Sequence, residues 1–122
     1  MDMRIQGIRG AITVDKNSER EIIDKTKELL KTIIDANDLD ISNIISIIFT
    51  ATKDLDAAYP AVAARELGMV ETPLFCCQEM YVEGSLDKCI RVLIHVERRE
   101  DKKPKHIYLG RAVNLRPDLA KL

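Results

Sequence analysis

Apolar residues recur along the chain with two different periods, and these predict strands and helices. Residues 3–14 alternate between apolar positions and small or polar ones, which is typical of a strand. Ser18 and Glu21 form a capping box, and the apolar residues behind it recur every three or four positions as far as Ala36. This pattern predicts an amphipathic helix that ends before Asn37.

The second part of the chain contains short apolar runs, which predict strands and one further helix. Pro60 suits the first turn of a short, alanine-rich helix over residues 61–67. Further strands are expected at 44–50, 72–79, 89–96 and 106–109. Residues 97–105 are highly charged and are expected to form a solvated loop, and the tail behind them a turn or short helix.

The order of these elements is β-α-β-α-β-β-β. It predicts one α+β (mixed α/β) domain with a single sheet of about five strands and two main helices. Two helical crossovers come first, and hairpin-like links are expected to join the last strands. Because two helices leave one face of such a sheet uncovered, we expect copies of the chain to associate.

Composition and charge argue against several classes of protein. The 122 residues are 46% hydrophobic and 4% aromatic, and their net charge is −1. Near-neutral charge and scarce aromatic rings argue against nucleic-acid binding. No apolar run approaches the roughly 20 residues that span a membrane, and the first residues lack a signal-peptide pattern. Three cysteines are too few for a disulfide scaffold, so we expect a cytoplasmic protein without membrane or nucleic-acid partners.

Two arginines inside apolar strands are the most informative candidates for chemistry. Arg9 lies between Ile8 and Gly10, and Arg91 lies in the most apolar predicted strand. A guanidinium cannot lose its proton, so a buried one needs an anionic partner. That partner is either an internal carboxylate or a bound anion, unless the strand is at an edge and leaves the group in water. Further arginines in the sequence favour a pocket for carboxylates or phosphates.

The remaining candidates are weaker by themselves. Glu79 ends a predicted strand and could pair with an arginine or accept a hydrogen bond from a ligand hydroxyl. The cysteines and the two histidines, His95 and His106, have no metal-ligand spacing, and each cysteine is expected to be a small buried side chain. Phosphate-loop and nucleophile-elbow motifs are absent from the sequence. This inventory suits binding of a small polyanion, or a reaction that needs only electrostatics and orientation.

Five segments in order along the chain closely resemble the monofunctional chorismate mutases of the trimeric, pseudo-α/β-barrel type. They are RIQGIRGAITV (4–14), ATKDLDAAYPAVAARELG (51–68), CCQEM (76–80), GSLDKCIRV (84–92) and HIYLGRAVNLRPDL (106–119). The resemblance implies that residues 1–122 are one chorismate mutase domain, whose sheets pack into a trimer core with active sites between subunits. It also implies an isomerase that converts chorismate to prephenate without a cofactor, on the route to phenylalanine and tyrosine.

The resemblance further implies roles for nine residues, three of them catalytic. Arg91 matches the arginine that contacts the substrate's ether oxygen and a carboxylate. Glu79 matches the glutamate that hydrogen-bonds the ring hydroxyl, and Arg9 an arginine that binds a carboxylate. Six further residues are implied to bind or cover the substrate: Tyr108, Cys76, Tyr59, Arg65, Leu115 and Arg116. No metal is implied.

The resemblance also implies where parts of the site come from. Residues 59–65 are expected to reach the site from the neighbouring subunit, and the C-terminal strand and tail, 106–122, to close over it. Two positions depart from the pattern. Val62 replaces a lysine that a relative carries at the pocket rim, which is expected to weaken substrate capture. Phe75 replaces a hydroxyl residue, so its side chain is expected to lose a polar contact.

Two other functions fit the residues less closely. One is a small trimeric imine/enamine deaminase, which also grips a carboxylate with arginine but carries a C-terminal motif that this sequence lacks. The other is a sensing module that binds an anionic metabolite without converting it. Loss of chorismate and formation of prephenate distinguish both from a mutase.

Overall fold

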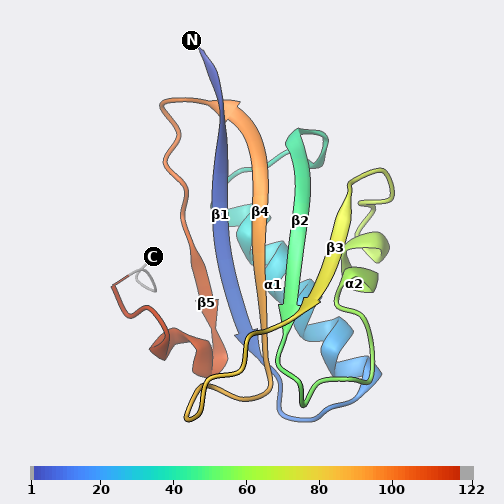
Figure 1. Cartoon of the computed structure of the whole chain (residues 1–122). Coiled ribbons are helices and arrows are strands. Elements are labelled where there is room, and N and C mark those ends of the chain that lie inside the picture. Colours follow the sequence, from blue (N-terminus) through green and yellow to red (C-terminus); the bar gives the residue numbers. More distant parts are fainter. Residues whose placement is uncertain (1, 119–122) are drawn as a thin grey trace.

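A computed structural model of the chain describes residues 2–118 as one mixed β-sheet with two helices on one of its faces (Figure 1). The strands are β1 (Met3–Thr13), β2 (Ile44–Ala51), β3 (Leu74–Gln78), β4 (Cys89–Arg99) and β5 (Ile107–Leu109). The helices are α1 (Glu19–Ala36) and α2 (Ala61–Glu66), with 3-10 turns η1 (Ile41–Asn43) and η2 (Gly110–Asn114). The predicted α+β fold with one five-stranded sheet and two main helices is confirmed. In the described part of the chain, neither helix is both long enough and apolar enough to cross a membrane.

Helix α1 begins and ends where the sequence pattern predicts. The Ser18 side chain accepts a hydrogen bond from the Glu21 backbone N–H at 3.2 Å, which satisfies one of the unpaired donors of the first turn. At the other end, the side chain of Asn37 donates to the backbone carbonyls of Ile33 and Lys105. The helix buries one stripe against the sheet: Ile22, Thr26, Leu29, Leu30 and Ile33.

The strand order is β3-β2-β4-β1-β5, so the expected hairpin-like links are wrong. β4 is inserted between β1 and β2 and is antiparallel to both, whereas β3 and β5 are parallel edge strands. β4 carries a long run of alternating apolar residues, and it is buried in the middle of the sheet because strands pair with both of its edges. The chain must therefore cross from β3 over β2 to reach β4, instead of turning back on its neighbour.

β4 is also longer than predicted, because residues 97–99 continue the strand instead of opening the charged loop. They pair with the first residues of β1, in the register Met3 with Arg99. Arg98 points to the helix-covered side, where its Nε donates to the Gln6 side chain and its Nη1 to the Asn37 carbonyl, each at 2.8 Å. A charged residue can thus continue the strand because its polar head is held at the C-terminal end of α1.

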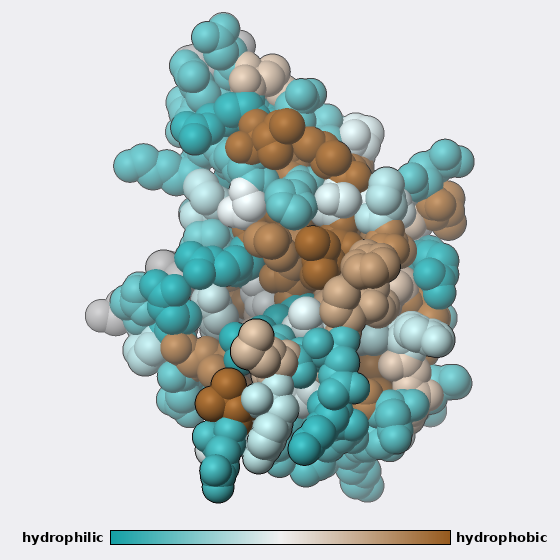
Figure 2. Space-filling view, in the orientation of Figure 1, coloured by the Kyte–Doolittle hydropathy of each residue, from teal (hydrophilic) through white to brown (hydrophobic). Residues whose placement is uncertain are grey.

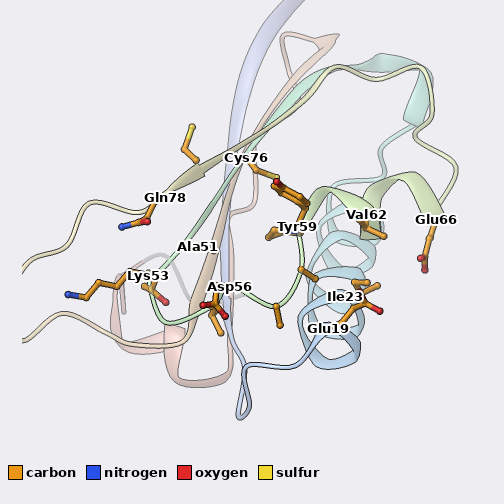
Figure 3. Close-up of a pocket in the computed structure, with 16 residues that line it drawn as sticks. Glu19, Ile23, Ala51, Lys53, Asp56, Tyr59, Val62, Glu66, Cys76 and Gln78 are labelled. Atoms are coloured by element: carbon orange, nitrogen blue, oxygen red, sulfur yellow. The ribbon is translucent and has the colours of Figure 1, made fainter.

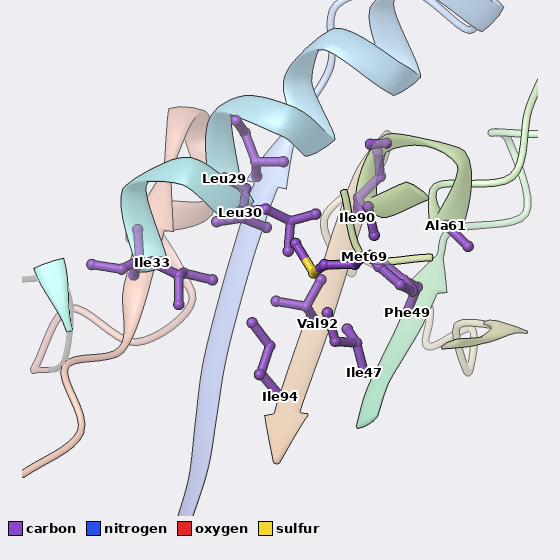
Figure 4. Close-up of a cluster of buried hydrophobic side chains, with 14 of the residues drawn as sticks. Leu29, Leu30, Ile33, Ile47, Phe49, Ala61, Met69, Ile90, Val92 and Ile94 are labelled. Atoms are coloured by element: carbon purple, nitrogen blue, oxygen red, sulfur yellow. The ribbon is translucent and has the colours of Figure 1, made fainter. Parts of the chain in front are cut away.

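The core lies between the helices and one face of the sheet (Figure 4). The alternating residues of β4 predicted to face the core are buried there: Ile90, Val92, Ile94 and Val96. Gly10 on β1 allows α1 to approach closely, since a Cβ at this position would lie 2.7 Å from Cδ1 of Ile33. This layer fixes which face of each strand remains available for function.

The opposite face, called here the open face, is covered by described residues only near Ala11 and Cys89, where η2 and the loop before β4 pack against it. It exposes large apolar side chains, including Ile5 (63% exposed) and Phe75 (66% exposed). Figure 2, in the orientation of Figure 1, shows apolar side chains across the middle of this view. The expectation that one chain leaves a face of its sheet uncovered is therefore confirmed for most of this face.

Candidate active site

Arg91 lies near the start of β4, on the open face. Its neighbours Ile90 and Val92 are buried beneath the helices, so strand alternation directs Arg91 to the other side. In the sheet register it is paired with Thr50 on β2 and Ala11 on β1. Its side chain is 38% exposed, and its buried Nε makes no hydrogen bond within residues 2–118. One donor of the guanidinium is thus shielded from water without a hydrogen bond.

Glu79 approaches Arg91 from the end of β3. Its backbone N–H donates to the Ala51 carbonyl at 2.9 Å, which continues the pairing of β3 with β2 beyond Gln78. Its Oε1 lies 3.5 Å from the Arg91 Nε, and the same oxygen accepts a hydrogen bond from the Thr50 hydroxyl at 2.5 Å. The structure therefore brings the arginine and the carboxylate together as a loose ion pair.

Tyr108, on β5, lies on the same face of the sheet as Arg91. In the register it is paired with Ala11, which is itself paired with Arg91, so Tyr108 and Arg91 flank this small residue. Tyr108 is buried with Ala11, Cys89 and Ala112, and Leu115 packs against this group. The short side chain of Ala11, between the arginine and the tyrosine in the sheet register, is fully buried.

Arg9 lies on the same face, two residues before Ala11, and its own side chain is exposed. Its backbone N–H donates to Nδ1 of His106 at 2.9 Å, which requires this nitrogen to be unprotonated. Burial lowers the pKa of His106, and the nearby charges of Arg9 and Arg116 lower it further. A neutral imidazole therefore fixes the backbone that carries Arg9.

Arg116 follows Leu115 in the tail and is paired with Asp118 through its Nε and Nη2 at 3.1 and 2.9 Å. These hydrogen bonds raise the pKa of Arg116, and Tyr108 adds a smaller electrostatic effect in the same direction. The tail thus carries a cation near Tyr108. Residues 119–122, the end of the tail expected to close over the site, lie outside the described residues.

The cysteines occupy three different environments. Cys89 is buried beside Arg91, and burial raises the pKa of its thiol to about 11 although Arg91 acts against this. The expectation of a small buried side chain is confirmed for Cys89 and wrong for Cys77, which is exposed because it projects from the open face beside Thr50. Cys76 is half-buried, and burial raises the pKa of its thiol, opposed by the backbone of Ala61 and the charge of Arg65.

Tyr59, Arg65 and Cys76 form a second group, on the other side of β3. Cys76 is paired with Phe49, which is buried on the helix side, whereas Glu79 meets Thr50 on the open face. Tyr59 is 71% exposed and lines, with Cys76 and Val62, a groove of about 700 Å³ between β3, α2 and the start of α1 (Figure 3). Within one chain, this group is separated from the Arg91–Glu79 pair by the edge strand.

Sequence reasoning missed Thr50 and the positioning of Arg9 by His106. The alternation of residues 44–50 places Thr50 opposite the buried Phe49, which could have indicated its face. The contact with Glu79 depends on the parallel pairing of β2 with β3, which no local pattern specifies.

Comparison with known proteins identifies the family. A family model described as chorismate mutase type I matches residues 5–119. The chain belongs to the chorismate mutase type I family. Chorismate mutase AroH of Bacillus subtilis (strain 168) is 46% identical over 120 residues, covering 97% of this chain and 94% of the relative. Chorismate mutase AroH of Thermus thermophilus is 43% identical over 118 residues, covering 94% and 96%.

A solved structure supports the same family. The chorismate mutase from Clostridium thermocellum Cth-682 superposes with a TM-score of 0.84 at 52% identity, covering 88% of this chain and 96% of that chain. The resemblance noted in the sequence is confirmed over almost the whole chain. Chorismate mutases are isomerases, so the expected enzyme class is also confirmed, and the deaminase alternative is not supported.

Proposed function

We propose that this chorismate mutase rearranges chorismate to prephenate beside Arg91 on the open face, as a step toward phenylalanine and tyrosine. The observation that carries the assignment is the guanidinium itself. Its Nε is buried, makes no hydrogen bond within residues 2–118 and lies 3.5 Å from a carboxylate oxygen of Glu79. An unpaired buried donor costs free energy in the ligand-free chain, and an anionic substrate oxygen removes that cost.

The chemistry needs charge stabilisation and orientation. In this Claisen rearrangement the ether C–O bond breaks while a C–C bond forms within one molecule, so no cofactor takes part. Negative charge grows on the ether oxygen and the ring becomes partly cationic. We assign Arg91 to the ether oxygen, and Glu79 to the ring hydroxyl, where its charge also favours the cationic ring.

The rearrangement needs a compact conformer of chorismate, and we assign its binding to the groups around Arg91 and Glu79. Arg9 and Tyr108 fix a carboxylate of the dianion, and Leu115 and Arg116 in the tail cover it. A rate enhancement of about 10⁶-fold requires about 8 kcal/mol. Removal of one preorganised donor typically costs about 3–4 kcal/mol, so two such groups supply most of this amount and orientation supplies the rest.

We further propose a homotrimer in which the open faces of three copies meet and each site lies between two subunits. The exposed apolar side chains of this face support it, because Ile5 and Phe75 would leave water on association. The separation of the two residue groups also supports it, since Tyr59, Arg65 and Cys76 cannot face Arg91 of their own chain across β3. They would complete the site of a neighbour. We place the protein in the cytoplasm, where its free thiols stay reduced.

Active-site complementation tests both the reaction and the shared site. Chorismate loss is followed by ultraviolet absorbance, with prephenate identified as the product, and Arg91→Ala and Arg65→Ala are each expected to be nearly inactive. Co-expressed at equal amounts, the two variants should regain about a quarter of the native sites, because random mixing pairs an intact Arg91 with an intact Arg65 at that frequency. Arg20→Ala, at an exposed arginine of α1 paired with Asp24, is the control. If the wild type bound chorismate without converting it, the proposed reaction would be contradicted. If activity did not recover on mixing, the shared site would be contradicted.

A further inference from the structure

Thr50 has no role in the site assigned above, although it lies at its centre. We propose that Thr50 is a positioning residue, whose hydroxyl holds Oε1 of Glu79 and prevents the carboxylate from closing onto Arg91. The inference rests on the proposed function, in which Arg91 and Glu79 both contact the substrate. It adds a reason why two opposite charges at the centre of the site do not cancel each other.

The fold places Thr50 between the two charged groups. In the register of the sheet it is paired with Arg91 on one side and with Cys77, two residues before Glu79, on the other. The preceding residue, Phe49, is fully buried on the helix side, so Thr50 projects from the open face. Strand pairing therefore fixes this hydroxyl relative to both charges.

The contacts show an arrangement different from an ordinary ion pair. Arginine and carboxylate normally form short, often bidentate hydrogen bonds of about 2.7–2.9 Å. Here the Arg91 Nε is 3.5 Å from Oε1 of Glu79 and makes no hydrogen bond within residues 2–118. The same Oε1 accepts the Thr50 hydroxyl at 2.5 Å. The hydroxyl takes the position on this oxygen that the guanidinium would otherwise take.

This competition has two consequences for the reaction. The Nε–H of Arg91 stays available for the ether oxygen, where negative charge develops. Glu79 is held by one oxygen and can offer the other to the ring hydroxyl. Without Thr50, the carboxylate would turn toward the guanidinium, and the substrate would have to break a full ion pair before either group could act.

A purely structural role for Thr50 makes a different prediction. Threonine and valine have similar shapes and both favour strands, so a residue that only builds β2 could be replaced by valine without loss. A positioning residue loses its function with the hydroxyl and keeps it in serine. The distinction therefore depends on the hydroxyl and on Glu79, and not on the strand.

The experiment is a double-mutant cycle of Thr50→Val and Glu79→Ala, with Thr50→Ser as the conservative variant. Thr50→Val should lower kcat by roughly 10- to 100-fold, the effect of a hydrogen bond to a charged group. Thr50→Ser should stay within about threefold of wild type, and in the Glu79→Ala background the valine should cost less than about twofold, because the coupled partner is gone. Thr32→Val, which removes a hydroxyl bonded to the Glu28 carbonyl on α1, is the matched control.

The outcomes separate this inference from the proposed function. Wild-type kcat in Thr50→Val, or an equal loss with and without Glu79, would overturn the role of Thr50 while leaving the mutase assignment intact. Wild-type activity in Glu79→Ala alone would overturn the proposed role of Glu79 and the inference with it. If the valine variant does not fold, Thr50→Ala removes the same hydroxyl and completes the cycle.

Discussion

Replacing Arg91 by lysine keeps the positive charge at the centre of the site but removes the planar group that carries it. The guanidinium presents its Nε in a buried position 3.5 Å from Oε1 of Glu79, together with two further nitrogens. Lysine presents one flexible ammonium at the end of its chain, with no donor at the position of Nε. In the lysine variant we also expect the ammonium to pair directly with Glu79.

The magnitude follows from the loss of at least one oriented donor. Such a loss costs about 3–4 kcal/mol in the transition state. At about 1.4 kcal/mol per factor of ten, kcat should fall roughly 10²- to 10³-fold. Stability should change little, since the Arg91 side chain is 38% exposed and an exposed ion pair contributes at most about 1 kcal/mol.

Steady-state ultraviolet assays of chorismate loss measure kcat, and thermal unfolding measures stability. Arg20→Lys, at an exposed arginine on α1, provides the matched control and should behave as wild type. A lysine variant with kcat within about threefold of wild type would refute the reasoning, because charge alone would then suffice. A large loss of stability would instead mean that Arg91 holds the fold.

Three further predictions concern the tail, the open face and His106. Truncation before Leu115 should raise KM more than it lowers kcat, because the tail acts in capture, and the reverse split in steady-state kinetics would contradict this. Ile5→Asp, which puts a charge on the open face, should convert a trimer to smaller species in light scattering while circular dichroism is preserved, and an unchanged mass would exclude this face as the interface. Burial and the charges of Arg9 and Arg116 lower the pKa of His106 in the folded chain below its ordinary 6.5. Between the folded-state pKa and 6.5, the unfolded chain therefore binds more protons than the folded chain. The stability contributed by neutral His106 is complete above pH 6.5 and is lost as the pH falls through the folded-state pKa. The melting temperature of wild type should therefore drop more on acidification than that of His106→Gln. Parallel melting curves for the two proteins would disprove the linkage.

Local patterns in the sequence were sufficient for most elements of the fold. The capping box at Ser18 and the apolar stripe to Ala36 are both short-range features, and they determine α1 within one chain segment. Alternation in β4 likewise identified its buried face and placed Arg91 opposite it. A guanidinium cannot be neutralised, so several arginines, two of them in apolar strands, favoured an anion pocket, while an internal carboxylate remained an alternative partner.

Only the tertiary structure decided how these pieces meet. Every strand edge offers the same backbone donors and acceptors, so the sequence of a single strand does not say which partner it takes. The insertion of β4 between β1 and β2, and the parallel pairing of β2 with β3, bring Thr50 to Glu79 and separate Cys76 from them on the other side of β3. The sequence alone shows which residue types are present, but the distances between their side chains follow from pairings between strands that lie far apart in the chain.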